Sequence, residues 1–191
     1  MLQACGRWFL SGATALFISA ASAQIPAERL AACGACHGAD GNSAIPGIPS
    51  LAAQPKVFLE HYLVLTREGI RGSEVMQALL KGITDREIVA LAAHYSGLPL
   101  RPQPGRLDAA LFARGREVAE KNHCGSCHVP SYHGQEQMPR LAGQREEFLH
   151  DSMVAYRQNR RPGGDTIMAA SLHGIADADL KALAHFLAHS K

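Results

Sequence analysis

Two five-residue segments carry residues whose types and spacing suit the attachment of a metal-bearing group. They read CGACH, from Cys33 to His37, and CGSCH, from Cys124 to His128. The spacing C-x-x-C-H is typical of c-type haem attachment, in which two thiols bond to the porphyrin and the histidine binds the iron. Cysteine and histidine are also zinc ligands, and cysteines of exported proteins commonly form disulfides.

The histidine that directly follows each cysteine pair distinguishes these alternatives. Structural zinc takes four ligands in a tetrahedron, for which an adjacent Cys-His pair is awkward. The same pair suits haem, because the thioethers fix the porphyrin edge while the histidine turns under the iron. The sequence therefore predicts two covalently attached haem c groups. Their proximal iron ligands are His37 and His128, and their thioether bonds come from Cys33, Cys36, Cys124 and Cys127.

The two segments belong to a longer internal repeat. Residues that follow the first cysteine pair recur after the second at an offset of 90 and, after a slip of two residues, at 92. Order and spacing hold over about sixty residues, which indicates a duplicated module. The matched positions include Pro49 and Pro139, Leu51 and Leu141, Gln54 and Gln144, Arg67 and Arg157, Met76 and Met168, and Asp85 and Asp177.

Helices must position these residues. Apolar residues recur at helical spacing near the end of both modules, and Thr84 with Glu87 fits a capping box, while Asp177 is expected to cap the equivalent helix. Nothing alternates like a strand for more than a few residues. The predicted fold is all-α, with further helices over residues 26–32, 56–67, 108–121 and 145–157.

The modules are predicted to be separate domains joined by a proline-rich linker, GLPLRPQPG, because proline stiffens the chain and cannot continue a helix. The expected division is a signal peptide over 1–23, a first domain over 24–98, a linker over 99–105 and a second domain over 106–191. Helical domains this small have a thin core, which a buried haem would complete.

The N-terminal segment predicts export. Arg7 precedes an uncharged, mostly apolar run, and Ala21-Ser22-Ala23 fits a signal peptidase site with Gln24 as the new N-terminus. The run is too short to span a bilayer, which takes about 20 residues. The mature chain then carries 18 basic and 17 acidic residues, and no basic stripe points to a nucleic-acid partner.

The continuation of each motif resembles a known family. C-x-x-C-H-G-x-x-G from Cys33 to Gly41, then P-x-L-x-x-Q, a helix, a methionine and a last amphipathic helix resemble the class I cytochrome c fold. Two tandem modules, which cover essentially all of the mature chain, resemble the dihaem cytochrome c4 family. The resemblance implies two haem domains that face each other and exchange electrons.

In that family the proline carbonyl of the P-x-L segment accepts a hydrogen bond from the proximal histidine. By position this implies Pro49 for His37 and Pro139 for His128. The second module departs from the family pattern, since Val129 stands where a glycine usually follows the histidine. The loop from Val129 to Met138 is therefore expected to be shaped differently.

The second axial ligand of the second haem has three candidates. Met138 and His133 lie only ten and five residues after His128, which leaves too little chain to reach the opposite face of the porphyrin. Met168 lies forty residues on, and its repeat counterpart Met76 lies thirty-nine after His37. Met76 and Met168 are therefore predicted as the distal ligands.

The remaining candidates have weaker support. Met153 lies in mid-helix, where core packing is expected. His123 could tune the second haem. Arginine forks could pair with haem propionates, although solvent exposure is the ordinary state of such residues. The arginines considered for the propionates are Arg67, Arg157, Arg160 and Arg161. Surface or core-edge positions are expected for the helical histidines, which are His61, His94, His150, His173, His185 and His189.

The predicted function is single-electron transfer in the periplasm between a donor and a terminal oxidase, without substrate chemistry, because histidine and methionine would fill both axial positions of each iron. Methionine ligation raises the reduction potential, which suits delivery to an oxidase. The partners are then redox proteins, and peripheral association with the membrane is compatible with the absence of a spanning segment in the mature sequence.

Two other functions are considered. The first is the dihaem subunit of a periplasmic dehydrogenase, such as flavocytochrome c sulfide dehydrogenase, whose cytochrome subunit is similar in architecture. The second is a dihaem peroxidase, which needs an open or displaceable ligand and usually a longer chain, so the matched methionines disfavour it.

Overall fold

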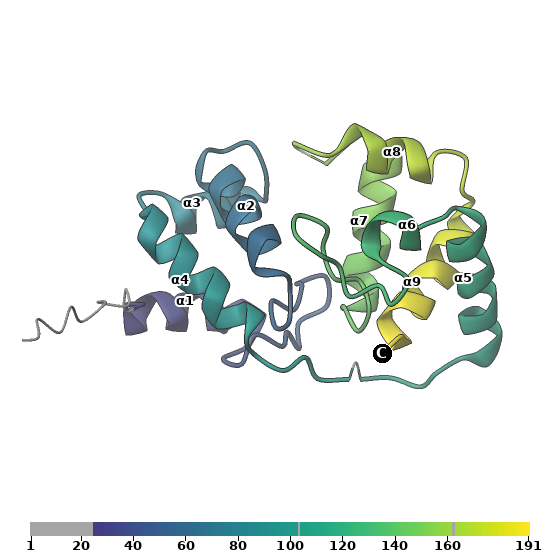
Figure 1. Cartoon of the computed structure of the whole chain (residues 1–191), viewed down its shortest axis with the longest axis horizontal. Coiled ribbons are helices and arrows are strands. Elements are labelled where there is room, and N and C mark those ends of the chain that lie inside the picture. The colour runs from purple at the N-terminus through teal and green to yellow at the C-terminus, as the bar shows by residue number, and fades with distance from the viewer. Residues whose placement is uncertain (1–24, 103, 162) are drawn as a thin grey trace, which may run out of the picture.

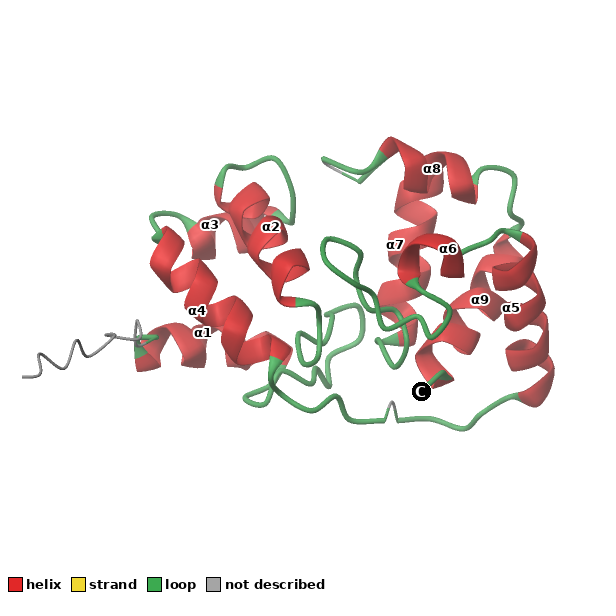
Figure 2. Ribbon diagram, viewed as in Figure 1, coloured by secondary structure: helices red, strands yellow, loops and turns green. Residues whose placement is uncertain are grey.

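A computed structural model describes residues 25–102, 104–161 and 163–191. Within these residues the chain forms helices, loops and one isolated β-bridge between Gln135 and Met138. The predicted all-α fold is confirmed (Figure 2). The helices are α1 Ala27–His37, α2 Lys56–Arg67, α3 Glu74–Leu80, α4 Asp85–Ser96, α5 Ala109–Lys121, α6 Gly125–His128, α7 Glu146–Arg157, α8 Thr166–Leu172 and α9 Asp177–His189.

Two hydrophobic clusters form, one in each half of the chain. The first is built from α2, α3 and α4, and its buried members are Leu59, Leu80, Ile83, Ile88, Leu91, Ala92 and Tyr95. The second is larger and includes Val118, Leu149, Met153, Leu172, Leu180, Leu183 and Leu187 from α5, α7, α8 and α9. Figure 1 shows the two helical groups side by side, joined by one extended connection.

Side-chain caps account for four of the nine helix starts among the described residues. The side chains of Ser73, Asp108 and Asp165 accept hydrogen bonds from the first turns of α3, α5 and α8. Thr84 and Glu87 form the predicted capping box of α4.

The predicted cap of the last helix is wrong by one residue. Ala176 is the N-cap of α9 and Asp177 is its first helical residue, where a carboxylate still favours the positive end of the helix. The Asp177 carboxylate accepts a hydrogen bond from Arg157 instead of capping the backbone.

The helices before the two cysteine pairs differ from each other. α1 runs without a break through the first motif and ends at His37, well beyond the predicted end at residue 32. In the second module α5 ends at Lys121, His123 takes a positive φ of 53°, and the short α6 carries the second motif. The two short helices that carry Met76 and Met168 were not predicted.

The connection between the modules is irregular over its described residues, 97–102 and 104–108, and the first module anchors its start. Asn42 donates to the carbonyl of Pro99 and accepts from the backbone of Arg101, whose guanidinium pairs with Asp40. In the part of the chain that the structure describes, no helix is long and apolar enough to cross a membrane.

Candidate haem sites

The proximal histidine of the first module lies at the C-terminal end of α1 with 7% of its surface exposed. Its Nδ1 donates to the carbonyl oxygen of Pro49 at 2.8 Å. Burial lowers the pKa of His37, so the neutral imidazole is favoured, and the hydrogen bond fixes the tautomer with a basic Nε2. A basic Nε2 on an oriented ring is what a haem iron requires.

The second module repeats this geometry. His128 is 5% exposed at the end of α6, its Nδ1 donates to the carbonyl of Pro139 at 3.0 Å, and burial lowers its pKa. Its Nε2 is buried and has no hydrogen-bond partner among the described residues. A buried acceptor without a partner costs free energy, and an iron ion at this nitrogen would satisfy it. The site therefore fits the group that the sequence predicts.

Helical spacing puts the attachment residues of the first module on one face. Cys33, Cys36 and His37 lie at positions i, i+3 and i+4 of α1, and such residues are neighbours on a helix surface. The first cysteine of each motif is half-buried against the core of its module, and the second is exposed. All four are free thiols in the described part of the chain, as thioether formation requires.

The candidate distal ligands lie beside the same cores as the cysteines. Met76 on α3 and Cys33 are both partly buried against the first cluster, and Met168 on α8 and Cys124 against the second. Thus each module brings its own cysteine and methionine to one hydrophobic region. A thioether there would meet a group that is also apolar over most of its area.

The two other methionines of the second module have different surroundings. Met138 lies in the loop that follows His128, where its backbone pairs with Gln135 in a narrow turn. Met153 is 7% exposed in the middle of α7 and belongs to the core, as mid-helix methionines commonly do.

An arginine in each module braces the segment that carries the methionine. Arg67, at the end of α2, donates to the carbonyl of Ile83 at 3.2 Å and pairs with Asp85 at 2.6 Å. Its counterpart at the end of α7 makes the equivalent bonds, with the backbone of residue 175 and the carboxylate of residue 177. The brace connects the end of α2 or α7 to the residues just after α3 or α8. It thereby holds each methionine-bearing helix against its core.

The loop of the second module is less unusual than predicted. Val129 and Tyr132 have φ values of 58° and 57°, and they occupy the positions of Gly38 and Gly41, whose φ values are 83° and 73°. The carbonyl of Tyr132 accepts from residues 141 and 142, as that of Gly41 accepts from residues 51 and 52. The expectation of a different shape is therefore wrong at these positions, and it holds only for the turn at residues 135–138.

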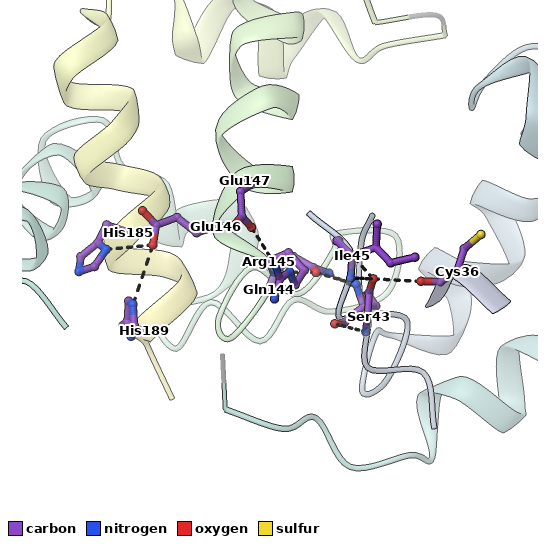
Figure 3. A network of polar contacts seen from close by, with 10 residues as sticks. Cys36, Ser43, Ile45, Gln144, Arg145, Glu146, Glu147, His185 and His189 are labelled. Atoms are coloured by element: carbon purple, nitrogen blue, oxygen red, sulfur yellow. Dashed lines mark hydrogen bonds and ion pairs between the residues drawn. The ribbon is translucent and has the colours of Figure 1, made fainter. Parts of the chain in front are cut away.

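The expected surface or core-edge position is wrong for His185. It is 4% exposed, its Nδ1 donates to Glu146 at 2.9 Å, and its Nε2 accepts from the backbone of Asp108 at 3.0 Å. The bond to Glu146 joins α9 to the start of α7 (Figure 3), and the bond from Asp108 joins α9 to the start of α5. His123 is exposed.

Gln54 and Gln144 stand out in the sequence only as matched positions of the repeat, but in the structure both lie between the modules. Gln144 bonds to the backbone of Ser50, and Gln54 to that of Arg140. Arg71 adds a third contact, from its guanidinium to the hydroxyl of Tyr156 at 3.0 Å. The repeated P-x-L-x-x-Q pattern marks both glutamines as equivalent positions of the two modules, but it does not show which groups their side chains contact.

Comparisons with known proteins agree with this geometry. The family described as cytochrome c matches residues 112–191. Cytochrome c4 of Pseudomonas aeruginosa is 31% identical, with 92% of each chain covered. The crystal structure of reduced recombinant cytochrome c4 from Pseudomonas stutzeri superimposes with a TM-score of 0.77 at 27% identity, covering 86% of this chain and 96% of that chain. The thiosulfate dehydrogenase electron acceptor of Stutzerimonas stutzeri is 28% identical, with 95% of this chain and 94% of the relative covered.

Proposed function

The chain belongs to the cytochrome c4 family of dihaem c-type cytochromes, and from this we propose that it carries single electrons between redox partners of a periplasmic respiratory chain, toward a terminal oxidase. As in cytochrome c4, it has two C-x-x-C-H haem sites with histidine and methionine ligation, and it is an electron-transfer protein. The observation that carries the proposal is that each module supplies an oriented proximal histidine and a methionine beside the same core.

We propose Met76 and Met168 as the distal ligands of the first and second haem. Their shared position in the repeat and their packing beside Cys33 and Cys124 support this assignment. With a histidine and a methionine from the chain on each iron, neither substrate nor oxygen would have a free coordination site. Methionine also raises the potential, which suits delivery of electrons to an oxidase.

When bound, each haem supplies a one-electron ferric/ferrous couple. The residues around it hold this couple in place: Pro49 and Pro139 orient the histidine rings, and burial excludes water from them. Ligands held in this way would limit the reorganisation that accompanies electron transfer.

We also propose a division into domains over 24–98 and 106–191 with a linker over 99–105, which the separate hydrophobic clusters support. The proposed signal peptide, 1–23, lies outside the described residues. N-terminal sequencing of protein exported by its native host tests the periplasmic location. Gln24 is expected as the first residue, and an intact Met1 would contradict export.

Oxidation by a terminal oxidase tests the main function. Pyridine haemochrome analysis should give two haems per mature chain. The ascorbate-reduced protein should then be oxidised rapidly by host membranes in a cyanide-sensitive reaction. Failure of the membranes to oxidise a protein with both haems would exclude the oxidase as its acceptor.

A second function has one specific observation in its favour, the similarity to a thiosulfate dehydrogenase electron acceptor. In this role the protein collects electrons from a periplasmic dehydrogenase, of which flavocytochrome c sulfide dehydrogenase is another example. Mixing the oxidised protein with a thiosulfate dehydrogenase and thiosulfate distinguishes the roles. Reduction within milliseconds, together with co-purification at one-to-one stoichiometry, would favour the dehydrogenase.

A further inference from the structure

Two glutamine side chains make four of the hydrogen bonds that join the modules. Gln144 accepts from the N–H of Ser50 at 2.8 Å and donates to the Ser50 carbonyl at 2.9 Å. Gln54 accepts from the N–H of Arg140 at 3.0 Å and donates to the Arg140 carbonyl at 3.0 Å. The glutamines are 5% exposed or less, so water competes little for these bonds.

The two pairs are related by the internal repeat. Gln144 is the counterpart of Gln54, and Arg140 is the counterpart of Ser50, each at an offset of 90. Each module therefore offers its glutamine to the same backbone position of the other module. In each pair a side-chain amide bonds to both polar groups of one residue, which fixes the relative position of the modules.

The peptide group that each glutamine reaches also bonds to a proximal histidine. The carbonyl of Pro49 accepts from His37, and the N–H of that same peptide unit belongs to Ser50 and donates to Gln144. In the second module the unit between residues 139 and 140 accepts from His128 and donates to Gln54. Each proximal histidine is thus one peptide group away from a glutamine of the opposite module.

The surroundings hold this peptide group in place. The hydroxyl of Ser50 accepts from the N–H of Ser43, whose own hydroxyl donates to the carbonyl of Cys36 in the first haem-attachment motif. The Gln144 carbonyl oxygen also accepts from the backbone of Arg145 at 2.8 Å. Figure 3 shows this polar chain running from Cys36 through Ser43 to Gln144 and Arg145.

Hydrogen bonds in series polarise one another. An amide N–H that donates to a glutamine oxygen shifts electron density toward its own carbonyl, which then accepts more strongly from the histidine Nδ1–H. The histidine becomes a stronger electron donor to iron, which stabilises the ferric state and lowers the potential. Both glutamines are neutral, so this effect needs no change of charge.

We propose that Gln144 and Gln54 are crossed positioning residues, each of which lowers the reduction potential of the haem in the opposite module. The inference rests on the proposed electron-transfer function and extends it. The same hydrogen bonds then hold the modules together and set the reduction potentials, so the potential of each haem depends on the position of the other module. A change in docking, such as one caused by a redox partner, would shift both potentials.

The test compares Gln144→Leu and Gln54→Leu with the unaltered protein in a redox titration followed by NMR, with haem methyl resonances assigned to each module. Gln144→Leu should raise the potential of the first haem and leave the second nearly unchanged, and Gln54→Leu should do the reverse. The expected change in the reduction equilibrium is a few-fold, below the tenfold that corresponds to about 59 mV.

Tyr156→Phe is the matched control, because it removes an inter-module hydrogen bond, that from Arg71, and leaves both histidine-linked peptides intact. It should shift neither potential. Small-angle X-ray scattering shows whether each variant keeps its modules docked. If Gln144→Leu separates them, Gln144→Glu is the second variant: its carboxylate still accepts from the Ser50 N–H, although it no longer donates to the Ser50 carbonyl, and it should lower the first potential.

Equal shifts of both haems, a shift in the haem of the mutated module, or no shift in docked variants would overturn the inference. Those results would leave the electron-transfer function intact, since it requires only that the unaltered protein titrate as two one-electron centres.

Discussion

His37 and His128 show how much of a haem site a few residues define. Each ring is buried, and each directs one nitrogen at a proline carbonyl, so the other nitrogen is left to bind an iron. The partner on the opposite side of each iron is a proposal, and it can be tested at single residues.

Met168→Ala should abolish the methionine-to-iron absorption of one module near the red edge of the oxidised spectrum. The potential of that haem should fall by a sizeable part of the roughly 0.8 V that axial ligands span. Met138→Ala is the control and should change neither property, because this residue lies in the loop next to His128. The assignment is wrong if the control loses the band and Met168→Ala keeps it.

Val129 holds a backbone conformation, φ 58° and ψ 158°, that is essentially reserved for glycine. Val129→Gly should relieve this strain and stabilise the second module by about 1 kcal/mol, after the entropic cost of glycine is subtracted. Thermal unfolding followed by circular dichroism should show a midpoint for the second module about 4–8 °C higher.

Gly38→Ala provides the comparison at the equivalent position of the first module. A Cβ there would lie 2.3 Å from the carbonyl oxygen of Asn42, so this variant should be destabilised. A lower midpoint for Val129→Gly would show that valine is not strained at residue 129.

At the scale of elements, the arginine brace links the middle helix to the start of the last helix in both modules. In the second module Arg157 donates to the carbonyl of Ile175 at 2.6 Å, and its side chain is 19% exposed. The Asp177 carboxylate that it also contacts is 84% exposed, and such ion pairs contribute little. The carbonyl bond is therefore the part of the brace that matters.

Arg157→Ala should weaken the hold on α8 and reduce the stability of the second module by about 1.5–3 kcal/mol, the usual contribution of a charge-assisted hydrogen bond. The measurement is the denaturant midpoint at which the methionine-to-iron band of the second haem is lost. Asp177→Asn should hardly move this midpoint. Equal effects of the two variants would show that the ion pair, and not the carbonyl bond, holds the helix.

At the scale of the whole molecule, direct contacts between the modules fix their arrangement. Gln54, Gln144 and Arg71 reach residues 85 to 94 positions away in the sequence. The start of the connection, at Pro99 and Arg101, bonds to the loop at Asp40 and Asn42 of the first module, and its end, at Asp108, bonds to His185 of the second module. The linker thus raises the effective concentration of one module near the other, while side chains determine how they fit.

Insertion of four glycine and serine residues between Pro104 and Gly105 should leave both potentials and the radius of gyration nearly unchanged. Lengthening a flexible connection costs little, about 0.6 kcal/mol for each doubling. Small-angle X-ray scattering and a redox titration measure the outcome. An expanded molecule with shifted potentials would show that the linker itself holds the modules together.

The sequence alone determined the chemistry and the outline of the fold. The haem motifs, the repeat and the helical periodicity are local patterns, and α2 begins and ends at the predicted residues, Lys56 and Arg67. The capping box at Thr84 is equally local, because all its partners lie within one helical turn. Such features depend on neighbouring residues, whose geometry the backbone fixes.

Only the tertiary structure decided which distant groups meet. Gln54 and Gln144 could equally have bonded to water, and the docking of the modules gives them backbone partners 86 and 94 residues away. His185 is buried because α5 and α7 both cover it, and Val129 takes a glycine-like φ because the repeated loop imposes it. These outcomes depend on how whole elements pack, and the free energy of that packing outweighs the preference of any single residue.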